Sequence, residues 1–113
     1  MEFTILERFV LLSLTEDVTS TYTNYRIIHD FRRALSFSEE EVKEFKITDS
    51  PEGATCPNWD ITTEIPVGDV IKGIVIKELE TLDKNGLVHE RYWGLFEKFN
   101  YGDLGEQGTE TSV

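Results

Sequence analysis

The sequence predicts an α+β protein that is mainly helical, with about five helices and one β-hairpin between the third and the fourth. Apolar residues recur three and four positions apart in these helical segments, and helix-capping residues stand where the segments begin or end. One stretch between them alternates apolar and polar residues, which is typical of strands. Three helices followed by a hairpin is also the order of a winged-helix module, so we consider a winged-helix-like arrangement.

The first predicted helix begins at a capping box, in which Thr4 and Glu7 bond each other's backbone amide. Apolar residues then continue with helical spacing to about Leu14. The stretch is apolar enough to suggest a signal peptide, but Glu7 and Arg8 interrupt it and it has no basic start. We therefore expect a buried helix.

A second helix is expected at residues 21–35, after a polar link at residues 15–20. Its residues divide into an apolar face and a basic side that we expect to face water. The apolar face holds Tyr25, Ile27, Ile28, Phe31 and Leu35, and the basic side holds Arg26, Arg32 and Arg33.

The third helix, at residues 38–45, is strongly acidic. Ser38 and Glu41 form a second capping box, and carboxylates in a first helical turn are stabilised by roughly 0.3–1 kcal/mol each. The acidity therefore has a structural explanation that needs no partner. A groove-reading helix needs basic residues against phosphates, whereas this one offers Lys43 alone against four glutamates. We expect no direct binding to nucleic acid.

A hairpin is predicted between residues 45–49 and residues 59–66. The first segment alternates apolar and polar residues, and in the second the apolar residues from Trp59 onward share one parity. Ser50 to Gly53 is a strong turn signal between them. A two-stranded hairpin is marginally stable in water, so its apolar face is expected to pack on helices.

The longest helix is expected to begin with Asp69 as its N-cap, to run to about Lys84 and to stop at Gly86. A last helix is expected at residues 89–99. We expect residues 1–99 to form a single globular α+β domain, which suits a chain of 113 residues. Residues 100–113 are rich in glycine and acids, so a flexible acidic tail is expected there.

The sequence resembles a group of small conserved proteins of tailed bacteriophages and prophages, a group of unknown function. The resemblance covers most of residues 3–99 and rests on "TILERFVLL", "RIIHDFRRALSFSEEEVKEF", "WD", "IPVGD" and "LETLDKNGLVHERYWGLFEKF". It departs from the group at Val88, which stands where a capping Thr or Ser is expected before the last helix. The resemblance implies a phage origin and a location in the host cytoplasm. It implies no activity and no site residues.

The side chains that usually carry catalysis or hold metals are sparse. Cys56 is the single cysteine and has no neighbouring cation to activate its thiol. His29 and His89 lie far apart in the sequence, so no zinc-ligand spacing exists. Carboxylate pairs are uninformative in an acidic protein, and no nucleophile elbow or phosphate-binding loop accompanies them. We expect neither an enzyme nor a bound cofactor or metal.

Charge is the unusual feature, with 22 acidic against 11 basic side chains and a net charge of −11. Residues 1–35 carry −1 of this, and the remainder carries −10. Such a field repels nucleic acid and anionic membranes and favours partners with a basic surface. It is also explained by solubility alone.

We expect a non-catalytic, phage-encoded protein-binding module that docks on a host or phage protein and modulates or inhibits it. One alternative is an acidic mimic of nucleic acid that blocks a DNA- or RNA-binding host protein. Another is a homo-oligomeric assembly factor that pairs through the helix at residues 69–84.

Candidate interface residues are exposed acids and aromatic side chains, since aromatics are over-represented at interface hot spots. They are Glu39, Glu40, Glu44, Trp59, Asp60 and Trp93. For Trp59 and Trp93, packing in the core is the competing interpretation, because both fit an apolar strand or helix pattern.

Overall fold

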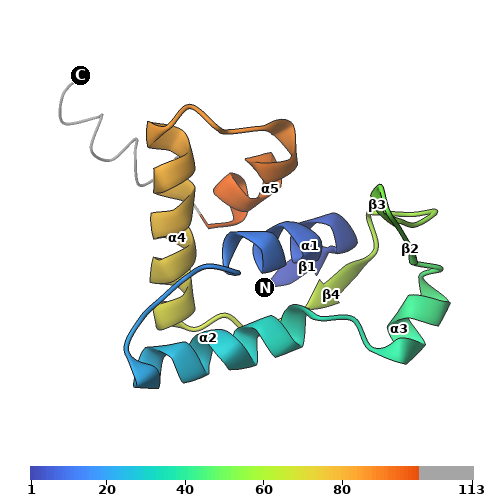
Figure 1. Cartoon of the computed structure of the whole chain (residues 1–113), viewed down its shortest axis with the longest axis horizontal. Helices are drawn as coiled ribbons and strands as arrows, with labels where there is room; N and C mark the ends of the chain where they lie inside the picture. Colours follow the sequence, from blue (N-terminus) through green and yellow to red (C-terminus); the bar gives the residue numbers. More distant parts are fainter. Residues whose placement is uncertain (100–113) are drawn as a thin grey trace.

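The computed structural model describes residues 1–99 and confirms the α+β class (Figure 1). The helices are combined with two small antiparallel sheets of two strands each. The elements in chain order are β1 (Glu2–Thr4), α1 (Ile5–Leu14), α2 (Tyr22–Leu35), α3 (Glu39–Glu44), β2 (Thr48–Ser50), β3 (Gly53–Thr55), β4 (Thr62–Glu64), α4 (Asp69–Lys84) and α5 (Glu90–Lys98). The acidic tail predicted at residues 100–113 lies outside the described residues.

The predicted hairpin between residues 45–49 and 59–66 is wrong, because each segment pairs with a different strand. β2 turns directly into β3, with Asp49 opposite Ala54. β4 pairs instead with β1 at the start of the chain, with Phe3 opposite Thr63. This second pairing holds β1 in the core, where the side chain of Phe3 is fully buried.

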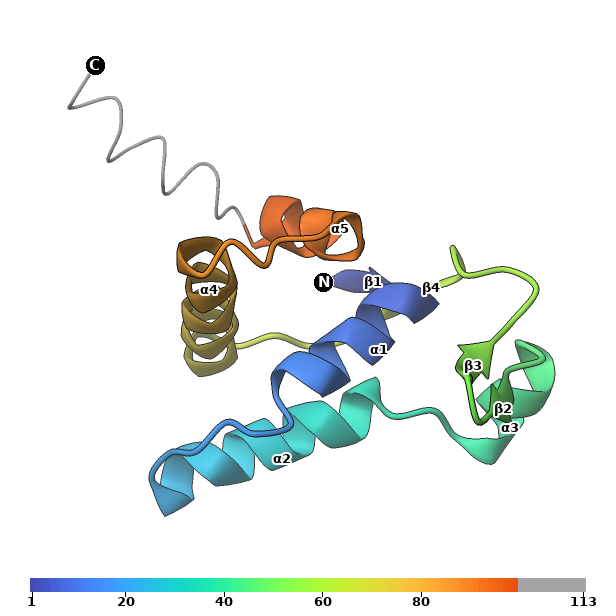
Figure 2. The same ribbon diagram turned by 45° about the horizontal axis from the view of Figure 1, so that its top comes forward.

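The α1 helix lies at the centre of the molecule, between α2 and α5 (Figures 1 and 2). The capping box of Thr4 and Glu7 is present at its start, and the predicted buried helix is confirmed. The core around it is made by side chains from β1, α1, α2, α4, α5 and the segment after β4. Its buried members are Phe3, Val10, Leu11, Ile28, Phe31, Leu35, Ile65, Ile71, Val75, Leu79, Leu95 and Phe99.

Two expectations for α2 need correction. Tyr25 and Ile27 are 40% and 38% exposed, so the buried face is narrower than the apolar pattern suggests. Arg32 does not simply face water: its Nη2 donates to the carbonyl oxygen of Leu12 at 3.2 Å. Within residues 1–99 its Nε is buried without a hydrogen-bond partner. The long aliphatic stem of Arg32 allows this inward course along the α1–α2 contact.

The ends of the later helices follow local capping chemistry. Gly68, not Asp69, is the N-cap of α4, and Asp69 is the first helical residue. Gly86 ends this helix with a φ of 65°, as predicted from its place in the sequence. Lys46 takes a similar φ of 54° after α3, which is uncommon for a residue with a Cβ. The Nδ1 atom of His89 accepts a hydrogen bond from the backbone amide of Arg91, the second residue of α5. His89 therefore caps this helix in place of the Thr or Ser expected at position 88.

Candidate functional site

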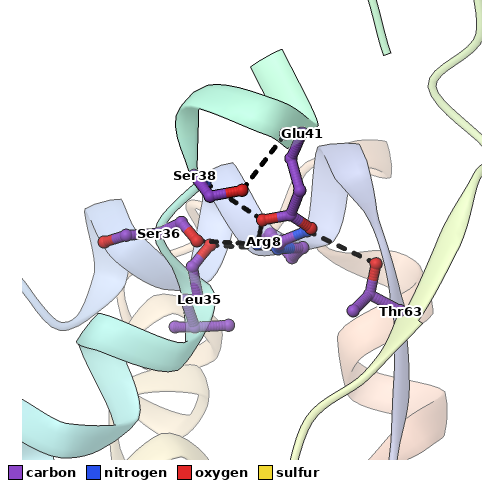
Figure 3. A network of polar contacts seen from close by, with 6 residues as sticks. All are labelled: Arg8, Leu35, Ser36, Ser38, Glu41 and Thr63. Atoms are coloured by element: carbon purple, nitrogen blue, oxygen red, sulfur yellow. Dashed lines mark hydrogen bonds and ion pairs between the residues drawn. The ribbon is translucent and has the colours of Figure 1, made fainter. Parts of the chain in front are cut away.

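A buried arginine joins four segments of the chain (Figure 3). Arg8 is 1% exposed, and its Nε and Nη2 donate to the carbonyl oxygens of Leu35 and Ser36 at 3.0 and 2.8 Å. Its Nη1 and Nη2 also bind both carboxylate oxygens of Glu41, at 2.9 and 3.2 Å. A weaker contact of 3.4 Å joins Nη1 to the hydroxyl of Thr63. One guanidinium thus fixes the end of α2, the start of α3 and β4 against α1.

Glu41 serves this arginine and its own helix at once. Its backbone amide donates to the Ser38 hydroxyl at 3.1 Å, and its Oε1 accepts from the Ser38 amide at 3.1 Å. This is the predicted capping box. Hydrogen bonds from Arg8 lower the pKa of Glu41, partial burial opposes the shift, and the Ser38 amide adds to it. The carboxylate is therefore charged and held in place.

Glu41 should make the stability of the protein depend on pH in acid. A carboxyl whose pKa is lower in the folded state stabilises that state above its unfolded pKa, which is about 4.3 for glutamate. This stabilisation is lost as the pH falls through the folded pKa. We expect the stability gap between the wild type and Glu41→Gln to be largest near neutral pH and to shrink below about pH 4. Urea unfolding across that range measures it, and a constant gap would contradict the ion pair.

Aromatic side chains continue this contact towards the loop before β4. The guanidinium carbon of Arg8 lies 3.9 Å from the ring centre of Phe37. The Phe37 ring lies 4.8 Å from that of Phe9, and the Phe9 ring meets Trp59 edge-on at 6.0 Å. These are favourable ring and cation–π geometries. The row of side chains attaches the segment after α2 to the outer side of α1.

The attached segment, residues 36–60, projects from the core, and we name it the acidic arm. It holds α3, β2 and β3, which lie at one end of the molecule, away from α4 and α5 (Figures 1 and 2). The structure describes all of its residues, and none of them is buried. Seven acidic and two basic residues give it a net charge of −5, against −1 for residues 1–35 and −2 for residues 61–99. The negative charge of the described chain is therefore concentrated on a segment without a fully buried residue.

The predicted acidic interface residues lie on this arm and are exposed. Glu39, Glu40 and Glu44 project from α3, and Asp60 lies in the loop before β4. The backbone amide of Asp60 donates to the Asn58 side-chain oxygen at 3.0 Å, which holds that loop in a turn. Five of the six candidate residues, these four and Trp59, therefore belong to the arm.

The two tryptophans have different environments. Trp59 is half-buried against Phe9, which agrees with the packing interpretation more than with a free interface side chain. Trp93 is 61% exposed on α5, which lies on another part of the molecule from the arm. Sequence reasoning did not single out Arg8 for a role. The available signal was a charged residue inside an apolar helix, since buried arginine is almost always paired.

A second polar contact closes the other side of α1. Lys98 of α5 donates to the carbonyl oxygen of Glu2 at 2.8 Å and to the carboxylate of Glu7. The Glu7 carboxylate also accepts from the Thr4 amide at 2.9 Å. Gly94 lies so close that an added Cβ would collide with Glu7 Oε2. Glycine at this position therefore permits the close approach of α5 to α1.

A small open pocket of about 170 Å³ lies beside this contact, between α1 and α5. It is lined by Leu6, Phe9, Val10, Ser13, Arg91 and Tyr92. The guanidinium carbon of Arg91 lies 5.1 Å from the Tyr92 ring centre, and both residues line the pocket. The pocket is smaller than the roughly 300–1,000 Å³ of typical small-molecule sites.

Comparison with protein-family models, curated proteins and solved structures gives no match for this chain. Among residues 1–99, no three His, Cys, Asp or Glu side chains are grouped so that they could hold a metal ion. Within the same residues, none of the helices combines the length and the apolar character that crossing a bilayer requires. The acidic arm carries the largest share of the net negative charge of residues 1–99 and is the candidate site considered below.

Proposed function

We propose that this chain is a non-catalytic, phage-encoded protein-binding module, and that its acidic arm docks on a basic surface of a host or phage protein in the host cytoplasm. The observation that carries the proposal is the arm itself. A segment of 25 residues with a net charge of −5 projects from the core, and none of its residues is fully buried. Exposed surface of one sign raises association rates with partners of the opposite sign.

The attachment of the arm supports a docking role. Arg8 and the aromatic row hold the base of the arm in one orientation, while the acids Glu39, Glu40 and Glu44 remain exposed. A surface that is held before binding loses less conformational entropy when it binds. Glu41 is the exception among the α3 glutamates, since Arg8 already neutralises it. The α3 helix thus presents its other acids without a competing partner within residues 1–99.

The test is differential capture. The wild type is immobilised beside two triple variants with the same change in charge: Glu39→Gln/Glu40→Gln/Glu44→Gln on the arm, and Glu16→Gln/Glu90→Gln/Glu97→Gln elsewhere. All six positions are exposed. We expect a basic protein from a bacterial lysate to be retained by the wild type and by the second variant. The arm variant should lose at least about tenfold in affinity, because local charge pairs contribute more than distant ones.

Equal retention by the wild type and by both variants would place binding on another face, and equal loss in both variants would show that net charge governs it; either result would contradict the proposal. Circular dichroism of the arm variant is the folding control. Carboxylates in the first turn of a short helix each contribute only about 0.3–1 kcal/mol, so their loss should leave the fold intact.

A mimic of nucleic acid is the second candidate function, and the concentration of acids on the arm favours it. In a winged-helix arrangement, α3 occupies the position of the groove-reading helix. Its glutamates would repel the phosphates of DNA there and would bind a basic protein surface instead. The captured partner should then be a nucleic-acid-binding protein whose binding to DNA or RNA is competitive with the arm. Simultaneous binding of nucleic acid and of this chain would exclude mimicry and leave the docking function in place.

A further inference from the structure

The outer face of α2 is basic and aromatic, in contrast to the rest of the chain. Tyr22, Arg26, His29 and Arg33 are spaced so that they fall within about 60° of one another around the helix. All four are exposed, and Tyr22 is 79% exposed. The buried residues of the helix lie on the opposite side. We name these four residues the α2 stripe.

The stripe has no partner within the described chain. The side chains of Arg26 and Arg33 form neither an ion pair nor a side-chain hydrogen bond with residues 1–99. His29 lies 3.9 Å from Asp30, a long contact between two exposed groups. Both views show α2 along one edge of the molecule with no element beyond it (Figures 1 and 2). Two free arginines and an exposed tyrosine form a surface suited to carboxylates.

We propose that the α2 stripe binds the acidic arm of a second copy of this chain. The two surfaces are complementary in charge, with Arg26 and Arg33 on one and a net charge of −5 on the other. The α2 stripe extends about 17 Å along its helix and α3 extends about 9 Å, so the stripe is long enough for α3 to lie along it. The proposal rests on the proposed function in that it uses the same arm, and it names one partner for it.

The arm must come from another copy because its own position is fixed. It begins directly after α2 and is held on the α1 side by Arg8 and Phe37, and α1 packs on the inner side of α2. It therefore cannot reach the outer stripe of its own helix. Each copy carries both surfaces. In a closed, two-fold symmetric pair, the acidic arm of each copy can therefore bind the α2 stripe of the other copy.

The overall charge sets the conditions for this association. Two copies with a net charge of −11 repel one another at long range. At about 0.1 M salt the Debye length is about 10 Å, which screens distant charges and leaves close pairs effective. At about 1 M salt it is about 3 Å, and the close pairs also weaken. Pairing is therefore expected to be stronger at the lower of these two concentrations.

Light scattering coupled to size exclusion tests the proposal with reciprocal charge reversals. One variant carries Arg26→Glu/Arg33→Glu on the stripe, and another carries Glu39→Lys/Glu40→Lys on the arm. At about 0.1 M salt we expect the wild type to pair, and each variant alone to pair at least about tenfold more weakly. An equal mixture of the two variants should restore pairing, because every contact again joins opposite charges. If the arm reversal disturbs α3, Glu44→Lys/Asp60→Lys reverses charge outside its first turn.

Two outcomes would overturn self-association: a wild type that stays monomeric at all concentrations, or a mixture that fails to restore pairing. Unchanged pairing in both variants would place the contact on another face and also overturn it. Failure here is distinguishable from failure of the proposed function. A monomeric wild type whose arm still captures a basic protein refutes only the self-association. A wild type that pairs, together with a neutralised arm variant that still captures that protein with full affinity, refutes only the proposed function.

Discussion

Replacing Arg8 by methionine is expected to lower the free energy of unfolding by about 3–4 kcal/mol. Methionine keeps the apolar stem and removes the guanidinium. Two carbonyl groups at the end of α2 and the carboxylate of Glu41 then lose their donor. Breaking a buried pair costs more than an exposed one because the remaining groups stay away from water. Urea unfolding at low protein concentration measures the change.

The control is Arg33→Met, which removes an exposed arginine from α2 and should change stability by no more than about 0.5 kcal/mol. Arg8→Lys should also be destabilising, because an ammonium cannot bind a carboxylate and two carbonyls in the same fork geometry. If Arg8→Met cost no more than the control, the guanidinium would not hold the arm. Hydrogen exchange of residues 36–60 should also become faster in Arg8→Met.

Replacing Gly94 by alanine is expected to destabilise the protein by about 1–3 kcal/mol, although alanine normally favours a helix. The added methyl group would collide with Glu7 Oε2. That carboxylate cannot move freely, since the Thr4 amide and Lys98 hold it and Glu7 is only 7% exposed. Either α5 must move away from α1, or the cap and the ion pair must break. Thermal or urea unfolding detects the loss.

Gly73→Ala on α4 is the matched control, because no atom beyond its chain neighbours and its own helical backbone lies within 4 Å of the Cβ it would add. It should stabilise the helix by about 0.5–1 kcal/mol. The two glycine substitutions are thus expected to have opposite signs. A second control combines Gly94→Ala with Glu7→Ala, and in that background the methyl group should no longer be harmful. Stabilisation by Gly94→Ala in the wild-type background would show that α5 does not approach α1 closely.

The parts of the fold that were predicted correctly are set by interactions between residues that are close in the sequence. Capping boxes at Thr4 and Ser38 placed two helix starts, and Gly86 placed the end of α4. The sheets were not predictable in this way. β1 has three residues, too few to show an alternating pattern, and it pairs with β4 across about sixty positions of sequence. Nothing in the chain near β4 indicates which strand it will meet.

The candidate site was predicted only in part, because some of its contacts join residues that lie far apart in the sequence. The acids on α3 were identified from composition, and the capping box explained Glu41 through its own helix. The second role of Glu41 depends on Arg8, which is 33 positions away in the sequence. Trp59 and Trp93 both fit apolar patterns, yet one packs on Phe9 and the other is mostly exposed. Which aromatic side chain is covered depends on the tertiary arrangement, which single-residue patterns do not encode.

Hydrogen exchange of the chain with and without its captured partner tests the role of the acidic arm most directly. Backbone amides in a docking surface exchange more slowly where the partner covers them. In the free protein, the amides of short exposed elements such as α3 and β2 exchange fast. We therefore predict that protection appears within residues 36–60 and that α4, at Asp69–Lys84, is unchanged. Protection confined to α4 or α5, with the arm exchanging as fast as in the free protein, would contradict the account.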